Sequence, residues 1–150
     1  MIRYLLALLL IFPAASSLVQ GQVLAQENIP PRYIARIELH TAAELMGSLR
    51  RAEMLQQQGS FKVGEDAPIA FVLHGPEAES LFASHYAENQ ALVNLAARLS
   101  AFNVVDIKVC EAWLGGKALD ASELPPFVGT VPYGPAEEKR LLKQEQYVYF

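Results

Sequence analysis

The chain has 150 residues, among them 12 lysine and arginine residues against 16 aspartate and glutamate residues, and its formal net charge is −4. A mildly acidic chain without clusters of basic residues argues against nucleic acid or an anionic membrane surface as its partner. The single cysteine, Cys110, excludes an internal disulfide, so packing must stabilise the fold.

The N-terminal segment has the three-part layout of a secretory signal peptide. Arg3 gives a positive start, residues 4–12 form a continuous apolar block, and small residues follow at positions 14–17. The apolar block is shorter than the roughly 20 residues that a membrane-spanning helix needs, which argues against an uncleaved anchor. These features predict export.

The site of cleavage has two candidates, after Ser17 and after Ala25, because small residues stand at both places. We take residues 1–25 as the signal peptide and residues 26–150 as one mature domain, a size that supports a real hydrophobic core. The expected mature protein is periplasmic, without stable insertion in the membrane.

The first part of the mature chain alternates between strand and helix patterns. Residues 33–39 alternate apolar and polar side chains as a strand does. Thr41 and Glu44 have the spacing of a capping box, which predicts a helix from there to about Gln58. Residues 69–73 are apolar on both faces, as a central parallel strand must be.

The second part continues the alternation. A turn at residues 74–76 leads into helical material up to residue 102, with a short first piece and a longer helix from Tyr86. The elements expected after it are a strand at 104–109, a short helix at 110–114 broken by Gly115 and Gly116, a strand at 127–132, a helix opened by Pro135 and a strand at 147–150.

Five strands that alternate with helices predict an α/β fold: a three-layer sandwich with a mostly parallel five-stranded sheet. Ligands of such sheets bind beyond the carboxyl ends of the strands. His40, His74, Cys110 and the pair Tyr133–Gly134 each follow one of the first four strands. We therefore expect these residues at one edge of the sheet, as a candidate site.

Cys110 has two interpretations. At the start of a helix, the backbone dipole and free N–H groups favour the reactive thiolate, with Trp113 as an apolar wall and Gly115–Gly116 as a loop over the thiol. Glu111 opposes this effect unless its side chain points to solvent. The alternative is an inert residue, because free cysteine is among the most frequently buried residue types.

The chain from residue 69 to residue 150 resembles the DsrE/DsrF-like sulfur-relay family. The resemblance lies in four elements in order: FVLHGP at 71–76, IKVC at 107–110 followed by glycine at 115, VPYGP at 131–135, and QYVYF at 146–150. Each element alone is weak, and their order and spacing together are moderately specific. Family members often carry basic residues between the cysteine and the glycine, and this chain has none there.

The resemblance implies a function and a site. Members are α/β proteins that assemble as trimers or hexamers, and several carry sulfur as a persulfide on the matching cysteine. It therefore implies Cys110 as the carrier of sulfane sulfur, received from a donor protein and passed to an acceptor protein. His74, Gly75 and Gly134 would shape the pocket, and no cofactor is implied.

Other site chemistries have weaker signals. His40, His74 and Cys110 are ligand types that suit zinc or copper(I), but no paired ligand spacing supports a metal, and we expect none. Neither the serine-hydrolase elbow nor the glycine fingerprint of dinucleotide binding occurs. The remaining candidate acids are interpreted as helix-start residues: Glu77, Glu79, Asp120, Glu123, Glu137 and Glu138. His85 is interpreted as a solvated or interface residue.

Two functional hypotheses follow. The first is a periplasmic sulfur carrier or thiol-active protein that uses Cys110, and is a carrier more than a turnover enzyme. The second is a binding or oligomeric assembly module, in which a strand-end pocket holds a small ligand and Cys110 is structural.

Overall fold

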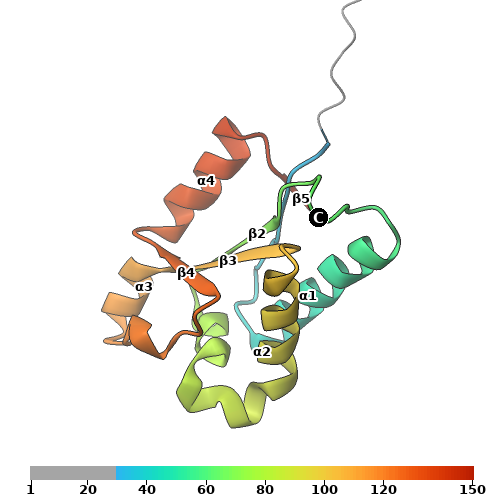
Figure 1. The fold of residues 1–150 in the computed structure, drawn as a ribbon. Coiled ribbons are helices and arrows are strands. Elements are labelled where there is room, and N and C mark those ends of the chain that lie inside the picture. Colours follow the sequence, from blue (N-terminus) through green and yellow to red (C-terminus); the bar gives the residue numbers. More distant parts are fainter. Residues whose placement is uncertain (1–29) are drawn as a thin grey trace, which may run out of the picture.

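The computed structural model describes residues 30–150, and Figure 1 shows their fold. The predicted signal peptide, residues 1–25, and the first residues of the predicted mature domain lie outside the described residues. No helix among residues 30–150 is long and apolar enough to cross a membrane.

Five parallel strands form one sheet in the order β4-β3-β2-β1-β5. The fold class predicted from the sequence, an α/β protein with a five-stranded parallel sheet, is confirmed. The bounds of the strands are β1 Tyr33–Ile34, β2 Ile69–Leu73, β3 Val105–Cys110, β4 Val128–Val131 and β5 Val148–Tyr149.

Four α-helices and three 3-10 helices connect the strands. The α-helices are α1 Ala42–Gln57, α2 Tyr86–Ala101, α3 Glu111–Gly116 and α4 Gly134–Gln144; the 3-10 helices are η1 Pro76–Leu81, η2 Ala83–His85 and η3 Ala121–Glu123. The first three crossovers step away from β1 in one direction, and the fourth returns to the other side of β1. Because parallel crossovers are right-handed, α4 must lie on the opposite face from α1 and α2, as Figure 1 shows.

The core has two parts, one on each face of the sheet. Alternate residues of β2 supply both: Ile69, Phe71 and Leu73 belong to the larger cluster with α1 and α2, whereas Ala70 and Val72 belong to the smaller cluster under α4. All five residues of β2 are buried, as the continuous apolar run predicted. The central strand is therefore held from both sides.

The first strand is shorter than predicted. The expected strand at residues 33–39 ends at Ile34, and the N–H of Ala35 makes the last bond to the sheet, to the carbonyl of Ala70. The chain then bends, and three successive N–H groups ending at His40 donate to the carboxylate of Glu44 at 2.8–3.0 Å. These three N–H groups therefore bond to the carboxylate of Glu44 and not to a neighbouring strand of the sheet.

The same carboxylate completes a modified helix cap. Thr41 Oγ1 accepts from the N–H of Glu44 at 3.1 Å, as the capping-box spacing predicted. The Glu44 side chain reaches past the cap to the preceding loop. His40 has a φ of 51°, an uncommon conformation for a residue with a side chain, which turns the loop into α1.

The helix after Cys110 also differs from the prediction. Gly115 and Gly116 are the last residues of α3 and do not break it, so they form no separate loop over the thiol. The helix ends because Ala118 adopts a left-handed conformation, with a φ of 53°, and the N–H of Lys117 bonds to the carbonyls of the last turn. Cys110 is the last residue of β3 and the N-cap of α3.

We expect deletion of residues 147–150 to unfold the domain. The N–H of Val148 donates to the carbonyl of Arg32 at 2.8 Å, and the ring of Phe150 lies 6.2 Å from the rings of both Tyr33 and Phe71. The deletion removes an edge strand and an aromatic residue packed against the core. Thermal unfolding followed by circular dichroism tests this.

The matched control is Tyr149→Phe, which keeps the strand and loses only the hydrogen bond to Glu138. We expect this variant to lose about 1 kcal/mol of stability. A truncated protein with an unchanged melting temperature would contradict the pairing of β5 with β1.

Candidate functional site

The strand ends meet at one edge of the sheet, as predicted, and form a pocket there. Its volume is ≈ 230 Å³, and its lining residues are His74, Cys110, Ala112, Trp113, Tyr133 and Pro135. Four of the predicted site residues, His74, Cys110, Trp113 and Tyr133, therefore share one pocket. The remaining three do not line the pocket. Gly134 packs against His74 and Cys110, and His40 and Gly75 lie next to each other beside His74.

Cys110 is nearly enclosed, with 2% of its surface exposed. Its Sγ accepts a hydrogen bond from the N–H of Trp113 at 3.4 Å, so the sulfur faces the first turn of α3. The carboxylate of Glu111 is exposed and accepts from the hydroxyl of Thr130 at 2.6 Å. The first turn of α3 therefore offers the sulfur a donor, and the neighbouring carboxylate lies in solvent.

Gly134 brings α4 into contact with the pocket. A Cβ at this position would lie 3.0 Å from Cβ of His74 and 3.1 Å from Cβ of Cys110. Such distances are shorter than normal contacts, so α4 begins with a glycine because its first turn lies directly on both residues. Tyr133, the N-cap of α4, is 57% exposed and forms part of the pocket rim.

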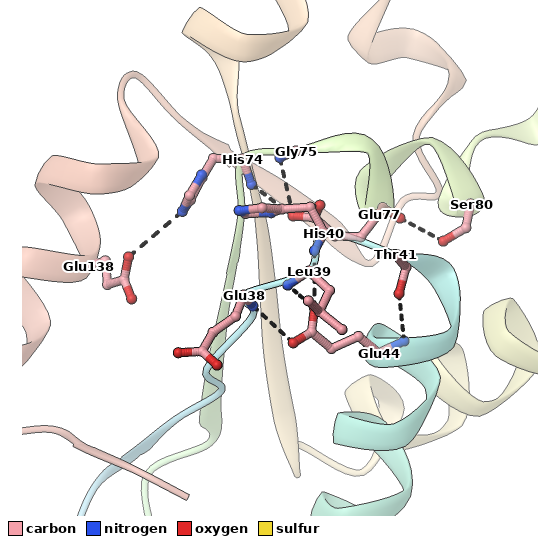
Figure 2. Close-up of polar contacts among 10 residues, drawn as sticks. All are labelled: Glu38, Leu39, His40, Thr41, Glu44, His74, Gly75, Glu77, Ser80 and Glu138. Carbon is pink, nitrogen blue, oxygen red and sulfur yellow. Dashed lines mark hydrogen bonds and ion pairs between the residues drawn. The ribbon is translucent and has the colours of Figure 1, made fainter.

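His74 forms an ion pair with a residue of helix α4. Its Nε2 lies 3.7 Å from Oε2 of Glu138 on α4, and Figure 2 shows the ring pointing toward that carboxylate. The other carboxylate oxygen of Glu138 accepts from the hydroxyl of Tyr149 at 2.7 Å. Partial burial and this hydrogen bond raise the pKa of Tyr149. Glu138 thus connects the pocket histidine with β5.

Glu77 is the residue at this edge whose role the sequence analysis missed. Its side chain is fully buried, and one oxygen accepts from the N–H groups of His74 and Gly75, both at 3.1 Å. The other oxygen lies 2.9 Å from Nδ1 of His40 (Figure 2). An acid just after a glycine-containing turn can reach back to free N–H groups, and that spacing is the signal that could have found it.

The two histidines lie against each other. The ring centroids of His40 and His74 are 4.9 Å apart, with the rings tilted by 59°. Each imidazole has its own carboxylate: Glu77 for His40 and Glu138 for His74. Each carboxylate therefore holds one imidazole at this edge of the sheet, and His74 is the one that lines the pocket with Cys110.

The structure also locates the other candidate ligands and acids. Within residues 30–150, no group of three or more His, Cys, Asp or Glu side chains is placed to hold a metal ion. The acids interpreted as helix-start residues include Asp120, whose side chain accepts from the N–H of Ser122 and whose pKa that bond lowers. Hydrogen bonds from Arg140 lower the pKa of Glu137 in the first turn of α4.

We expect Gly75→Ala to destabilise the protein by about 2 kcal/mol, because the new methyl group overpacks the site. A Cβ at this position would lie 2.5 Å from Nδ1 of His40 and 2.6 Å from Oε2 of Glu77. Urea unfolding measures the change. Gly47→Ala is the matched control, since a Cβ in this helix position meets nothing within 4 Å, and it should stabilise by about 0.5–1 kcal/mol. Equal effects of the two substitutions would contradict the close packing around Glu77.

Comparison with known proteins supports the fold. No family model and no curated protein matches the chain. Among solved structures, the chain is similar to MTH1491, a protein of unknown function from Methanobacterium thermoautotrophicum, with a TM-score of 0.53 and 17% sequence identity. The match covers 79% of this chain and 93% of that one. At this identity the likeness shows the fold alone.

Proposed function

We propose that this protein is a sulfur carrier of the DsrE/DsrF-like type, in which Cys110 takes up sulfane sulfur and passes it on. The observation that carries the proposal is the pocket that Cys110 shares with His74 at the end of the central strands. The N–H of Trp113 already donates to the sulfur, and such a bond favours negative charge on it. The resemblance of the surrounding sequence elements adds the identity of the cargo.

The loading step is a transfer of one sulfur atom without net oxidation. The Cys110 thiolate attacks the outer sulfur of a donor persulfide, R–S–SH; the new bond joins the two sulfurs, the old S–S bond breaks, and R–S⁻ leaves. The product is Cys110–S–SH. Delivery to an acceptor thiolate repeats the same exchange in the other direction, so the carrier needs no cofactor.

His74 is the residue that would manage the proton of the thiol. It lines the pocket with Cys110, and both lie against the same glycine of α4. Oε2 of Glu138 lies 3.7 Å from Nε2 of the imidazole, within ion-pair distance of a protonated ring. Under this proposal Cys110 is the nucleophile, His74 the base and Glu138 the carboxylate that orients the base, which are the roles found at activated cysteines.

The setting of this reaction belongs to the same proposal. The N-terminal segment predicts export to the periplasm, an oxidising compartment in which a persulfide needs shielding, and the enclosed position of Cys110 supplies it. Assembly as a trimer or hexamer is what the family resemblance implies. The exposed Tyr133 at the pocket rim is available for contact with a donor, an acceptor or another subunit.

A second candidate is the binding or assembly module, and one observation favours it. Cys110 is 2% exposed, which is the burial of an ordinary core cysteine. In that case the pocket walls of Trp113, Tyr133 and Pro135 hold a small ligand, and the thiol only packs.

The intact mass of the protein distinguishes the two candidates. The mass is measured for protein purified from the cells that make it, and again after exposure to excess polysulfide. A carrier should be heavier than its sequence mass by one or more sulfur atoms. Reduction should remove that mass. The same measurement gives the mature N-terminus and so tests the predicted cleavage.

Cys110→Ser is the control, because it removes the chain's single thiol with little change in volume. It should carry no sulfur and keep its thermal stability within about 1 kcal/mol. If the wild-type thiol stays unmodified and resists alkylation until the protein is unfolded, Cys110 is structural and the binding module is the better account.

A further inference from the structure

A second pocket lies apart from Cys110, between the segment that joins β2 to α2 and the loop that leads into β4. Residues between 81 and 93 line one side, and residues 122–126 line the other. Its volume is ≈ 400 Å³, and it shares no lining residue with the pocket of Cys110. We call it the Tyr86 pocket; the segment before α2 is the yellow-green stretch at the bottom of Figure 1.

The floor of the Tyr86 pocket is part of the hydrophobic core. Leu81 is 1% exposed and Val93 is 7% exposed, and both belong to the larger core cluster. A molecule in this pocket therefore buries its apolar surface against side chains that the fold already holds in place. Removal of that surface from water favours binding.

Hydrogen bonds and prolines hold the walls in place. The hydroxyl of Tyr86 donates to Oδ1 of Asn94, further along α2, at 3.2 Å. Pro125 and Pro126 form the opposite wall, where the proline rings fix φ and the N–H of Val128 donates to the carbonyl of Pro125 at 2.9 Å. Fixed walls reduce the conformational entropy that is lost when a ligand binds.

The rim of the pocket carries a carboxylate without a cation. Glu123 lines the pocket and accepts from the hydroxyl of Ser84 at 2.5 Å, a bond that links the two sides. Among residues 30–150, Glu123 takes part in no ion pair. No lysine, arginine or histidine of this described part lines the pocket. A positive group is therefore the charge that the pocket lacks.

We propose that the Tyr86 pocket binds a small organic amine, with the apolar body against Leu81 and Val93 and the ammonium group at the carboxylate of Glu123. Pockets of several hundred cubic ångströms, with apolar walls and a few polar groups, are the usual form of small-molecule sites. The face of an aromatic ring such as that of Tyr86 also attracts cations. A carboxylic acid with the same body meets like charge at Glu123. The pocket is separate from Cys110, so this inference does not depend on the proposed function.

Three probes with one aromatic body and different charges test the proposal. They are 2-phenylethylamine, which is a cation at neutral pH, the neutral 2-phenylethanol and the anion 3-phenylpropionate. Each is titrated into the ¹⁵N-labelled protein, and the backbone amide signals are followed by NMR. We expect the amine to move the signals of residues 83–86 and 122–124 and to bind at least about threefold more tightly than the alcohol. The anion should leave these signals unmoved.

Three variants identify the groups responsible. Glu123→Gln should reduce the affinity for the amine to that for the alcohol. Glu65→Gln is the matched control, because it removes the same charge from an exposed pair with Lys62 that does not line the pocket. Ala83→Leu adds a larger side chain at the pocket lining and should abolish binding of both the amine and the alcohol. The amide spectrum of each variant shows whether it has folded.

Several outcomes would overturn the proposal. Equal affinities for the amine and the alcohol, or tighter binding of the anion, contradict the choice of an amine. A loss of affinity in Glu65→Gln as large as that in Glu123→Gln assigns the effect to net charge. Signals that move at Ala112, Trp113 and Tyr133 instead place the binding in the pocket of Cys110. A folded Ala83→Leu variant that binds as the wild type does, or no movement with any probe, removes the site itself.

Discussion

The buried carboxylate of Glu77 is the contact on which this edge of the molecule depends. A charge without water is costly unless hydrogen bonds replace its hydration, and here three donors do so: the N–H groups of His74 and Gly75 and the ring of His40. Two of these come from the turn after β2 and one from the loop after β1. The carboxylate therefore fixes two loops relative to each other, and with them both histidines.

The pocket depends on the last crossover, from β4 to β5, which returns across the sheet in the direction opposite to the first three. The return from β4 to β5 puts α4 alone on the second face, where its first turn, at Gly134, covers Cys110 and His74. Glu138 on the same helix reaches His74 and also accepts from Tyr149 of β5. The edge strand, the second face and the candidate site are consequently one connected structure, and a change at the C-terminus should be felt at the histidine.

Local patterns predicted the elements that local physics controls. The bounds of α1 and β2, and the start of α2 at Tyr86, followed from apolar periodicity and a capping residue, and the structure confirms them. The predicted end of the first strand was wrong, because the carboxylate of Glu44 in the next helix accepts hydrogen bonds from N–H groups that would have continued the strand. The helix at residues 111–116 was also misjudged, since its glycines are permitted in the last turn and a left-handed Ala118 ends it.

The sequence by itself determined the α/β class and put the candidate residues Cys110, His74, Trp113 and Tyr133 at the strand ends, because alternation and chain order alone carry that information. Tertiary structure decided the partners. His40 and Glu77 are 37 residues apart, and His74 follows β2 whereas Glu138 lies on α4, so no spacing in the chain could reveal either pair. Such pairs form when strand order and crossover hand bring distant segments together, which is a property of the whole packed sheet.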